Sequence, residues 1–324
     1  MKGSYRIRIR SKRVSYDFTL YRNITIIQGD SATGKSTLVR LIDNYYNEGS
    51  SSGVKLECQK TCRVLGGKDW EHNLEAIKDS IVFLDEGNKF IKSDDFAEAI
   101  KNSDNYYVII TREDLSSLPY SVNEIYGIKI NGKTLENEPV YNEMYRIYGS
   151  YTASRPIEPV MVITEDSNSG FYFFEHVCKQ SGIKCISAEG KSKVVKHIKA
   201  ETTDRILLIA DGAAFGPHMR EVMQYLKIYT NYMIYLPESF EWLILKSGIF
   251  RSKVITDILD NPSDYIESSE YFSWERFFTA LLVKETADNK KISVYTKTGK
   301  LSNYYTNPEN TNKILNELKN IKLL

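Results

Sequence analysis

The chain of 324 residues has few cysteines and no long apolar run. Four cysteines are too few for a disulfide framework in a chain of this length, so a reducing cytoplasm is the expected compartment. No run approaches the roughly 18 apolar residues that a membrane span needs. Residues 1–10 lack the apolar core of a signal peptide. We therefore expect no membrane partner and no secretion.

A strong net charge is also lacking, because 43 Lys and Arg face 42 Asp and Glu, which leaves a net charge of +1. This balance excludes a generally basic nucleic-acid coat but allows a local basic patch. The composition, 42% hydrophobic and 26% charged, excludes collagen-like and wholly disordered chains. At roughly 150 residues per domain, the length predicts two domains.

In the first half of the chain, apolar runs and alternation predict an α/β domain. Arg6 to Arg10 alternate strictly with isoleucine, as in a half-buried strand, and Ile24 to Ile27 form a β-branched apolar run. The expected strands are 6–10, 14–20, 24–27, 55–65, 81–84 and 106–110, and the expected helices are 36–46, 70–78 and 94–102. Residues 131–159 have the weakest pattern, so we expect domains at 1–153 and 154–324.

The second half alternates between strand and helix patterns four times, which predicts a doubly wound parallel α/β sheet. Strands are expected at 160–164, 183–187, 205–210 and 232–236, followed by helices at 171–180, 192–199, 217–226 and 240–246. From about 270, the pattern predicts an extension made of a helix (274–282), a hairpin (292–305) and a final helix (310–323).

A phosphate-binding motif follows the strand 24–27. Residues 29–36 fit G-x-x-x-x-G-K-[ST] without a mismatch and lie between a strand and a helix. The glycines let the backbone amides face phosphates, and the helix dipole adds positive potential. Lys35 is expected to reach the β and γ phosphates, and Ser36 to ligate Mg²⁺. The predicted nucleotide-binding residues are Gly29, Asp30, Ser31, Ala32, Thr33, Gly34, Lys35, Ser36 and Thr37.

A second acidic motif ends the apolar strand 81–84. Asp85 and Glu86 follow it directly. Asp85 is expected to hold the Mg²⁺, usually through water, and Glu86 to orient or deprotonate the attacking water. The two motifs together predict ATP binding and hydrolysis with Mg²⁺.

These two motifs resemble the Walker A and Walker B motifs of the additional-strand P-loop ATPases, the group with the ABC-type and AAA-type enzymes, over residues 5–130. The resemblance implies a polar sensor after a further strand, for which Thr111 and Arg112 follow 106–110. Arg112 would act in cis or as a finger on a neighbour. We expect a homo-oligomer.

Two departures from that group matter. No LSGGQ-like signature is present, which makes a head-to-tail ABC dimer doubtful, and Leu65-Gly66-Gly67-Lys68 is only a weak likeness. Asn88-Lys89 is followed by Phe90-Ile91, so no N-K-x-D guanine reader is present and ATP is favoured over GTP.

Acidic residues follow three strands of the predicted second sheet: Glu165-Asp166, Asp211 and Glu238. Since carboxyl ends of parallel strands meet at one edge, these acids are expected to converge and bind Mg²⁺, with Glu165, Asp211 and Glu238 as ligands.

This pattern resembles a Toprim domain, in which a glutamate after strand one and D-x-D after strand three bind metal for phosphodiester chemistry. The second aspartate falls at Ala213, so nuclease activity is weakened or lost, or Asp166 or Glu238 compensates. A phospho-receiver fold is the alternative, but it needs a lysine after a fifth strand that the sequence does not indicate.

An ATPase joined to a Toprim-like domain resembles the overcoming-lysogenization-defect nucleases and related anti-phage ATPase systems. The leading hypothesis is Mg²⁺-dependent ATP hydrolysis that controls a Toprim-like effector in nucleic-acid processing or defence against mobile DNA. The expected partners are ATP, DNA or RNA, and a protein partner.

Two other functions stay open. One is a nucleotide-gated, non-catalytic regulatory protein with a degenerate Toprim-like or receiver-like domain. The other is a small-molecule kinase, against which Asp85-Glu86 argues. Cys58 and Cys62, expected on one strand face, lack the second pair that zinc would need and are interpreted as structurally buried or as surface residues.

Overall fold

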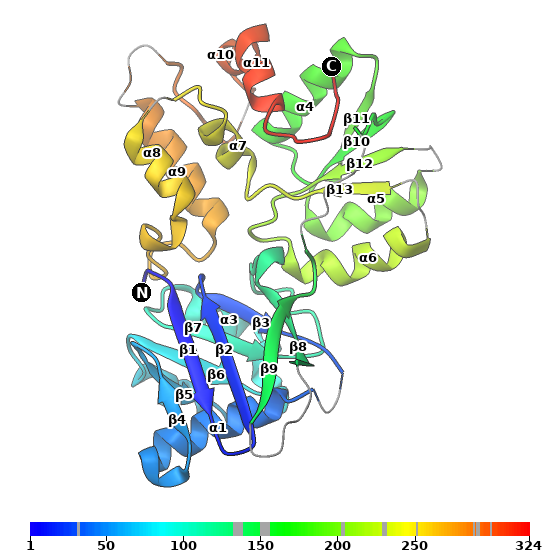
Figure 1. The fold of residues 1–324 in the computed structure, drawn as a ribbon. Coiled ribbons are helices and arrows are strands. Elements are labelled where there is room, and N and C mark those ends of the chain that lie inside the picture. Colours follow the sequence, from blue (N-terminus) through cyan, green and yellow to red (C-terminus); the bar gives the residue numbers. More distant parts are fainter. Residues whose placement is uncertain are drawn as a thin grey trace. The chain divides into compact units, whose positions relative to one another are not determined.

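The computed structural model describes residues 1–30, 33–131, 139–149, 156–201, 205–228, 232–250, 252–287, 289, 292–298 and 300–324 (Figure 1). The protein is α/β, as expected, with a nine-stranded mixed sheet followed by a four-stranded parallel sheet. The chain forms two compact units: Met1–Gly149 with Asn261–Phe272, and Ser150–Asp260 with Ser273–Leu324.

The first unit is built on the nine-stranded sheet, whose order is β4-β1-β2-β9-β8-β3-β7-β6-β5. Its strands are β1 (Tyr5–Arg10), β2 (Val14–Leu20), β3 (Ile24–Ile27), β4 (Lys55–Glu57), β5 (Thr61–Val64), β6 (Ser80–Leu84), β7 (Tyr106–Ile110), β8 (Ile125–Asn131) and β9 (Val140–Arg146). Its helices are α1 (Lys35–Glu48), α2 (Trp70–Glu75) and α3 (Asp94–Lys101). The strands β3, β7, β6 and β5 run parallel, whereas β1 pairs antiparallel with β2 and β4.

The two edge strands of this sheet, β4 and β5, are consecutive in the chain. Only residues 58–60 join them, although they stand at opposite ends of the strand order. A link of three residues spans roughly 10 Å at most, so the sheet is curled until its edges approach each other. We call residues 58–62, which are this link and the first two residues of β5, the seam.

Alternation along the parallel strands divides their side chains between two cores. Ile27, Phe83 and Ile110 face the core that contains α1, inside the curl. Their neighbours Val82 and Ile109 face the other core, which contains α2 and α3. The parallel strands are therefore buried on both faces, which explains why they read as continuous apolar runs.

A late part of the chain, residues 261–272, completes the first unit; we call it the returning segment. Phe272 packs in the core with α2 and α3, and Asn23 Nδ2 donates to its carbonyl at 3.1 Å. The amino group of Met1 bonds Glu267 and Ser268. Figure 1 shows this segment beside the N-terminus. The sequence pattern assigned these residues to the second domain.

The second unit contains a four-stranded parallel sheet in the order β11-β10-β12-β13. Its strands are β10 (Met161–Thr164), β11 (Lys184–Ser187), β12 (Ile206–Ile209) and β13 (Tyr232–Tyr235). Its helices are α4 (Ser169–Gln180), α5 (Val194–Ala200), α6 (Met219–Ile228), α7 (Phe240–Lys246), α8 (Lys253–Asp260), α9 (Trp274–Ala287), α10 (Asn303–Thr306) and α11 (Pro308–Leu315). Because β10 and β12 are central and parallel, their carboxyl ends meet at one edge.

Several expected elements differ in the structure. The strand expected at 55–65 is two strands, β4 and β5, and the strands β8 and β9 and the helix α8 were not expected. The hairpin expected at 292–305 is absent from the described residues there. Instead, Tyr295 N donates to Thr286 Oγ1 at 2.9 Å, and α10 begins at Asn303. The backbone of that segment thus bonds a side chain of α9 at Tyr295, where a hairpin would have bonded a second strand.

Candidate functional site

The first candidate site lies where three parallel strands of the first unit end. The order β3-β7-β6 and its register put Ile27 beside Ile110, and Leu84 beside Ile109. The residues that follow these strands, including the predicted phosphate loop (29–36), therefore share one edge of the sheet. Thr111 N donates to Ile27 O at 3.2 Å, which ties two of the strand ends directly.

The described part of the phosphate loop has the backbone that its glycines predict. Gly29 has a φ of 131° and Gly34 a φ of 94°, and Gly34 is the N-cap of α1. No side chain caps this helix, and no acidic residue lies in its first turn. The start of the helix therefore offers backbone amides and a positive dipole end, which suits a phosphate group. Ser31 and Ala32 lie outside the described residues.

The side chain of Lys35 is buried under the phosphate loop, with 5% of its surface exposed. Its Nζ donates to Gly29 O at 2.8 Å, to Asp30 O at 2.5 Å and to Thr33 Oγ1 at 3.0 Å. Burial lowers the pKa of Lys35, and Glu86 is the strongest carboxylate that opposes this shift. The ammonium is thus held inside the loop, within electrostatic reach of the acidic strand end.

Asp85 and Glu86 end β6 at the same edge. The carboxylate of Asp85 accepts the Glu86 amide at 2.8 Å and is half-buried, while Glu86 is exposed. Arg112 donates to both Glu86 oxygens, at 3.1 and 3.2 Å. The structure therefore brings Asp85, Glu86 and Arg112 to the edge that carries the loop.

Thr111 directly follows β7. Its side chain is buried, and its hydroxyl donates to Glu113 O at 3.2 Å and accepts from Glu113 N at 3.0 Å. The Thr111 hydroxyl thus stabilises the turn formed by residues 111–113.

The residues at this edge fit ATP and Mg²⁺. The uncapped helix end and the ammonium match a polyphosphate, and Asp85 is a hard oxygen ligand of the kind Mg²⁺ takes. Ser36 is exposed and Thr37 half-buried in the first turn of α1, close in sequence to Lys35. The residues that would hold the metal are Ser36 and Asp85.

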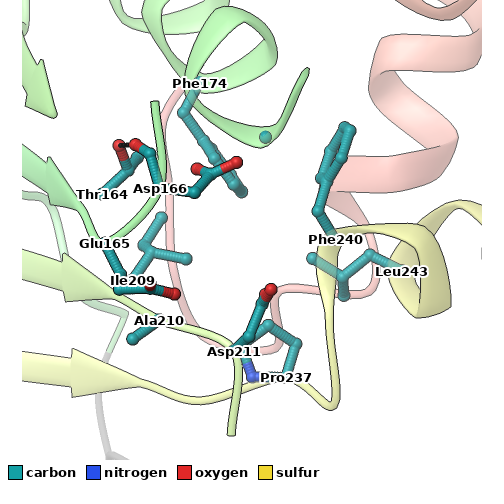
Figure 2. Close-up of a pocket in the computed structure, with 11 residues that line it drawn as sticks. Thr164, Glu165, Asp166, Phe174, Ile209, Ala210, Asp211, Pro237, Phe240 and Leu243 are labelled. Carbon is teal, nitrogen blue, oxygen red and sulfur yellow. Dashed lines mark hydrogen bonds between the residues drawn. The ribbon is translucent and has the colours of Figure 1, made fainter. Parts of the chain in front are cut away.

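The second candidate site lies where β10 and β12 end in the second unit. Figure 2 shows the carboxylates of Glu165, Asp166 and Asp211 turned toward a shared pocket whose other lining residues are mostly apolar. The cavity volume is about 10 Å³, room for one water-sized group.

Two lysines and two further glutamates surround these acids. Lys297 Nζ donates to Glu275 Oε1 at 2.8 Å and lies 3.9 Å from Glu241 Oε1. Lys191 Nζ donates to Glu275 Oε2 at 3.3 Å. The Tyr295 hydroxyl donates to Glu241 Oε1 at 2.8 Å, while Glu241 Oε2 is buried with no hydrogen-bond partner. Two ammonium groups of the chain thus lie within the carboxylate cluster, beside Glu275 and Glu241.

The pKa shifts in this carboxylate cluster have opposite signs. Burial raises the pKa of Glu165 to about 7, against the pull of Lys191. Burial and the charges of Glu275 and Glu165 raise the pKa of Asp211 well above its ordinary value. Burial opposes ionisation of Glu275 as well, but Lys191 and Lys297 lower its pKa to about 2. One glutamate is therefore kept charged while its neighbours favour the protonated form.

This arrangement does not fit the Mg²⁺ predicted at Glu165, Asp211 and Glu238. Among the described residues, no group of three or more His, Cys, Asp or Glu side chains is placed to hold a metal ion. Glu238 does not line the pocket; its neighbour Pro237 does. The physical reason is that Lys297 already supplies the positive charge, and α7 turns Glu241 rather than Glu238 toward the cluster.

Sequence reasoning missed Lys191, Glu241, Glu275, Tyr295 and Lys297. Lys191 could have been found from the sequence, since it follows the second expected strand. In the structure its neighbour Gly190 donates its amide to Glu165 O at 2.8 Å. Lys297 comes from a segment without regular structure, and only the fold brings it to the strand ends.

No protein-family model matches the chain, and no curated protein matches it either. No helix in the described part of the chain is long and apolar enough to cross a membrane.

Proposed function

We propose that the protein binds and hydrolyses ATP with Mg²⁺ at the first unit, on a sheet of the additional-strand P-loop type. The observation that carries the proposal is the strand order β3-β7-β6, which supports one site made of the phosphate loop, Asp85-Glu86 and Arg112. β7 lies between the loop strand β3 and the acidic strand β6, which supports a sheet of the additional-strand type.

Each residue then has a role that follows from its position. Lys35 neutralises the β and γ phosphates once its ammonium exchanges loop carbonyls for phosphate oxygens. The amides at the start of α1 donate to the same phosphates. Mg²⁺, held by Ser36 and Asp85, would supply charge neutralisation at the phosphates. Glu86 accepts a proton from the attacking water or orients it.

The test is ATP affinity, measured by calorimetry with Mg²⁺. Lys35→Ala is expected to lower affinity by about 100-fold or more, since a buried charge-assisted contact worth about 3 kcal/mol is lost. Lys101→Ala is the matched control, because Lys101 is paired with Glu98 on the surface of α3. Unchanged affinity in Lys35→Ala rejects the proposal.

For the second unit, the regulatory alternative is favoured over a nuclease. Lys297 beside Glu241 and Glu275 supports a domain, Toprim-like or receiver-like in its strand order, that has lost metal-dependent cleavage. Ala213 in place of an acid points the same way. The second unit would then respond to the nucleotide state and bind a partner without chemistry. The setting in nucleic-acid processing or defence against mobile DNA rests on the resemblance alone.

This second candidate is tested with Mn²⁺ and a mixture of DNA and RNA substrates, with and without ATP. We expect no cleavage of DNA or RNA. In calorimetry, we expect the heat of Mn²⁺ binding to be the same for wild type and for Asp211→Asn. Cleavage that Asp211→Asn abolishes would restore the nuclease hypothesis.

A further inference from the structure

The seam of the curled sheet carries two cysteines whose sulfurs share one turn. Cys58 Sγ accepts the Lys60 amide at 3.5 Å, and Cys62 Sγ lies 3.7 Å from Lys60 O, to which it donates. Each thiol also shifts the pKa of the other. The turn therefore places both thiols at the backbone of Lys60. The sequence pattern had placed them on one strand.

Lys60 ties the same seam to the strands on either side. Its Nζ bonds both oxygens of Asp79, just before β6, at 2.6 Å, and lies 5.7 Å from the ring centre of Tyr5 on β1. The seam thus joins β1 and β4 at one edge of the sheet to β5 and β6 at the other. A covalent bond here would fix the distance between the edges.

The two thiols differ in pKa and exposure. The Cys62 thiol, followed by the backbone amides of Lys60 and Gln59, lowers the pKa of the Cys58 thiol to about 7 against the effect of burial. Cys58 is half-buried, whereas Cys62 is 3% exposed. Cys58 is therefore the thiolate that meets an oxidant, and Cys62 is the neighbour that can close a disulfide.

We propose that Cys58 and Cys62 form a redox site for peroxides, in which a disulfide staples the seam of the curled sheet. The Cys58 thiolate attacks one peroxide oxygen, the O–O bond breaks, and sulfenic acid and hydroxide form. The Cys62 sulfur then attacks the Cys58 sulfur, the S–O bond breaks, and the leaving hydroxide takes the Cys62 proton as water. Two electrons pass from the thiols to the peroxide, and a dithiol reverses the reaction.

The seam also borders the helix of the phosphate loop. Cys62 packs in the same core as Leu38 and Ile42 of α1, which begins at Lys35. A disulfide that displaces the edge strands would also displace the core residues against which α1 packs. The second part of the proposal rests on the proposed ATP site: oxidation lowers ATP affinity.

Cys178 and Cys185 provide an internal control. Cys178 and burial raise the pKa of Cys185, and Cys178 is fully buried. We therefore expect this pair to stay reduced under the same treatment.

The chain offers a direct readout of the disulfide. Trypsin cleaves after Lys55, Lys60 and Arg63, so Cys58 and Cys62 fall on separate peptides, 56–60 and 61–63, unless a disulfide joins them. The full chain is treated with a small excess of hydrogen peroxide, alkylated, digested and analysed by mass spectrometry. We expect the linked peptide pair in the wild type and in Cys178→Ser/Cys185→Ser, and its absence in Cys58→Ser.

Wild-type protein in which both thiols remain alkylatable, or in which Cys58 becomes sulfinic acid without a linked pair, overturns the redox site. ATP affinity is then compared between oxidised and reduced protein, with an expected loss of about five-fold or more. Equal affinities overturn the coupling to ATP. Failure of all ATP binding would reject the proposed function, while the peptide readout would still stand.

Discussion

Arg112 grips the carboxylate of Glu86 with two nitrogens, at 3.1 and 3.2 Å, across the ends of the neighbouring strands β7 and β6. Both side chains are substantially exposed, at 53% and 37%, so the pair contributes about 1 kcal/mol or less to stability. The pair matters for position, because it orients the Glu86 carboxylate, which the proposed mechanism needs beside the phosphate loop.

The first prediction concerns that acid. Glu86→Gln should lower the rate constant of ATP hydrolysis by about 10²–10⁴, the usual contribution of a general base, with ATP affinity nearly unchanged. Single-turnover hydrolysis and calorimetry separate these two effects. Glu113→Gln is the control, since Glu113 is an exposed acid near the same edge that pairs with Lys92. Equal rates for the Glu86 variant and wild type would show that Glu86 has no such role.

The second prediction concerns the left-handed N-cap of α1. An alanine Cβ at Gly34, where φ is 94°, would lie 2.8 Å from the Tyr16 hydroxyl oxygen. Gly34→Ala should therefore cost about 1–3 kcal/mol of unfolding free energy, measured with urea, and weaken ATP binding.

Gly67→Ala separates the strain from the clash. Gly67 has a similar φ of 90° but nothing within 4 Å of the added carbon. It should cost less than Gly34→Ala, and Tyr16→Phe should partly rescue Gly34→Ala. Equal costs at the two glycines would mean that the contact with Tyr16 is unimportant.

The third prediction concerns pH. Folding raises the pKa of Glu165 from its ordinary 4.5 to about 7, because burial disfavours the charged form. Between these pH values the folded chain binds more protons than the unfolded chain, so the unfolding free energy should fall as pH rises, by up to about 1.4 kcal/mol per pH unit. Glu165→Gln should flatten this decline in urea unfolding between pH 4.5 and 7.

Glu221→Gln is the control for that experiment, because Glu221 lies exposed on α6. It should leave the decline as in wild type. A Glu165→Gln profile parallel to wild type would contradict the burial argument. The contribution of Glu275 to stability has the opposite pH dependence. Its pKa of about 2 predicts an unfolding free energy that decreases as pH falls from 4.5 toward 2.

The fourth prediction concerns Lys297. Lys297→Met leaves Glu241 and Glu275 with a buried charge that is poorly compensated, which should cost about 3–5 kcal/mol. Tryptophan fluorescence during urea unfolding is a suitable measurement, since Trp242 and Trp274 lie in the second unit. Adding Glu275→Gln should recover part of the loss.

Lys322→Met serves as the comparison, because its pair with Glu158 is exposed on both sides and should be worth less than about 1 kcal/mol. Similar costs for the two lysines would mean that Lys297 is an ordinary surface cation.

The parts of the fold that the sequence predicts well are those with local signals. The strands at 24–27 and 106–110 are confirmed to the residue, because both are continuous apolar runs buried on two faces. The phosphate loop could be located because its residues are contiguous.

Elements specified by their neighbours could not be predicted. In β9 only Asn142 is buried, so its sequence carries no clear alternation, and pairing with β2 and β8 defines the strand. The carboxylate cluster is similar. Glu165 and Asp211 follow strands and could be expected to meet, but Lys297 and Glu275 reach them from distant segments through tertiary packing.

The returning segment has a consequence for biosynthesis. Phe272 and Glu267, which close the first unit's core and hold its amino end, leave the ribosome only after the second sheet has been made. The first unit therefore cannot finish folding in the order of translation. Until that stretch emerges, the core that contains α2 and α3 lacks Phe272.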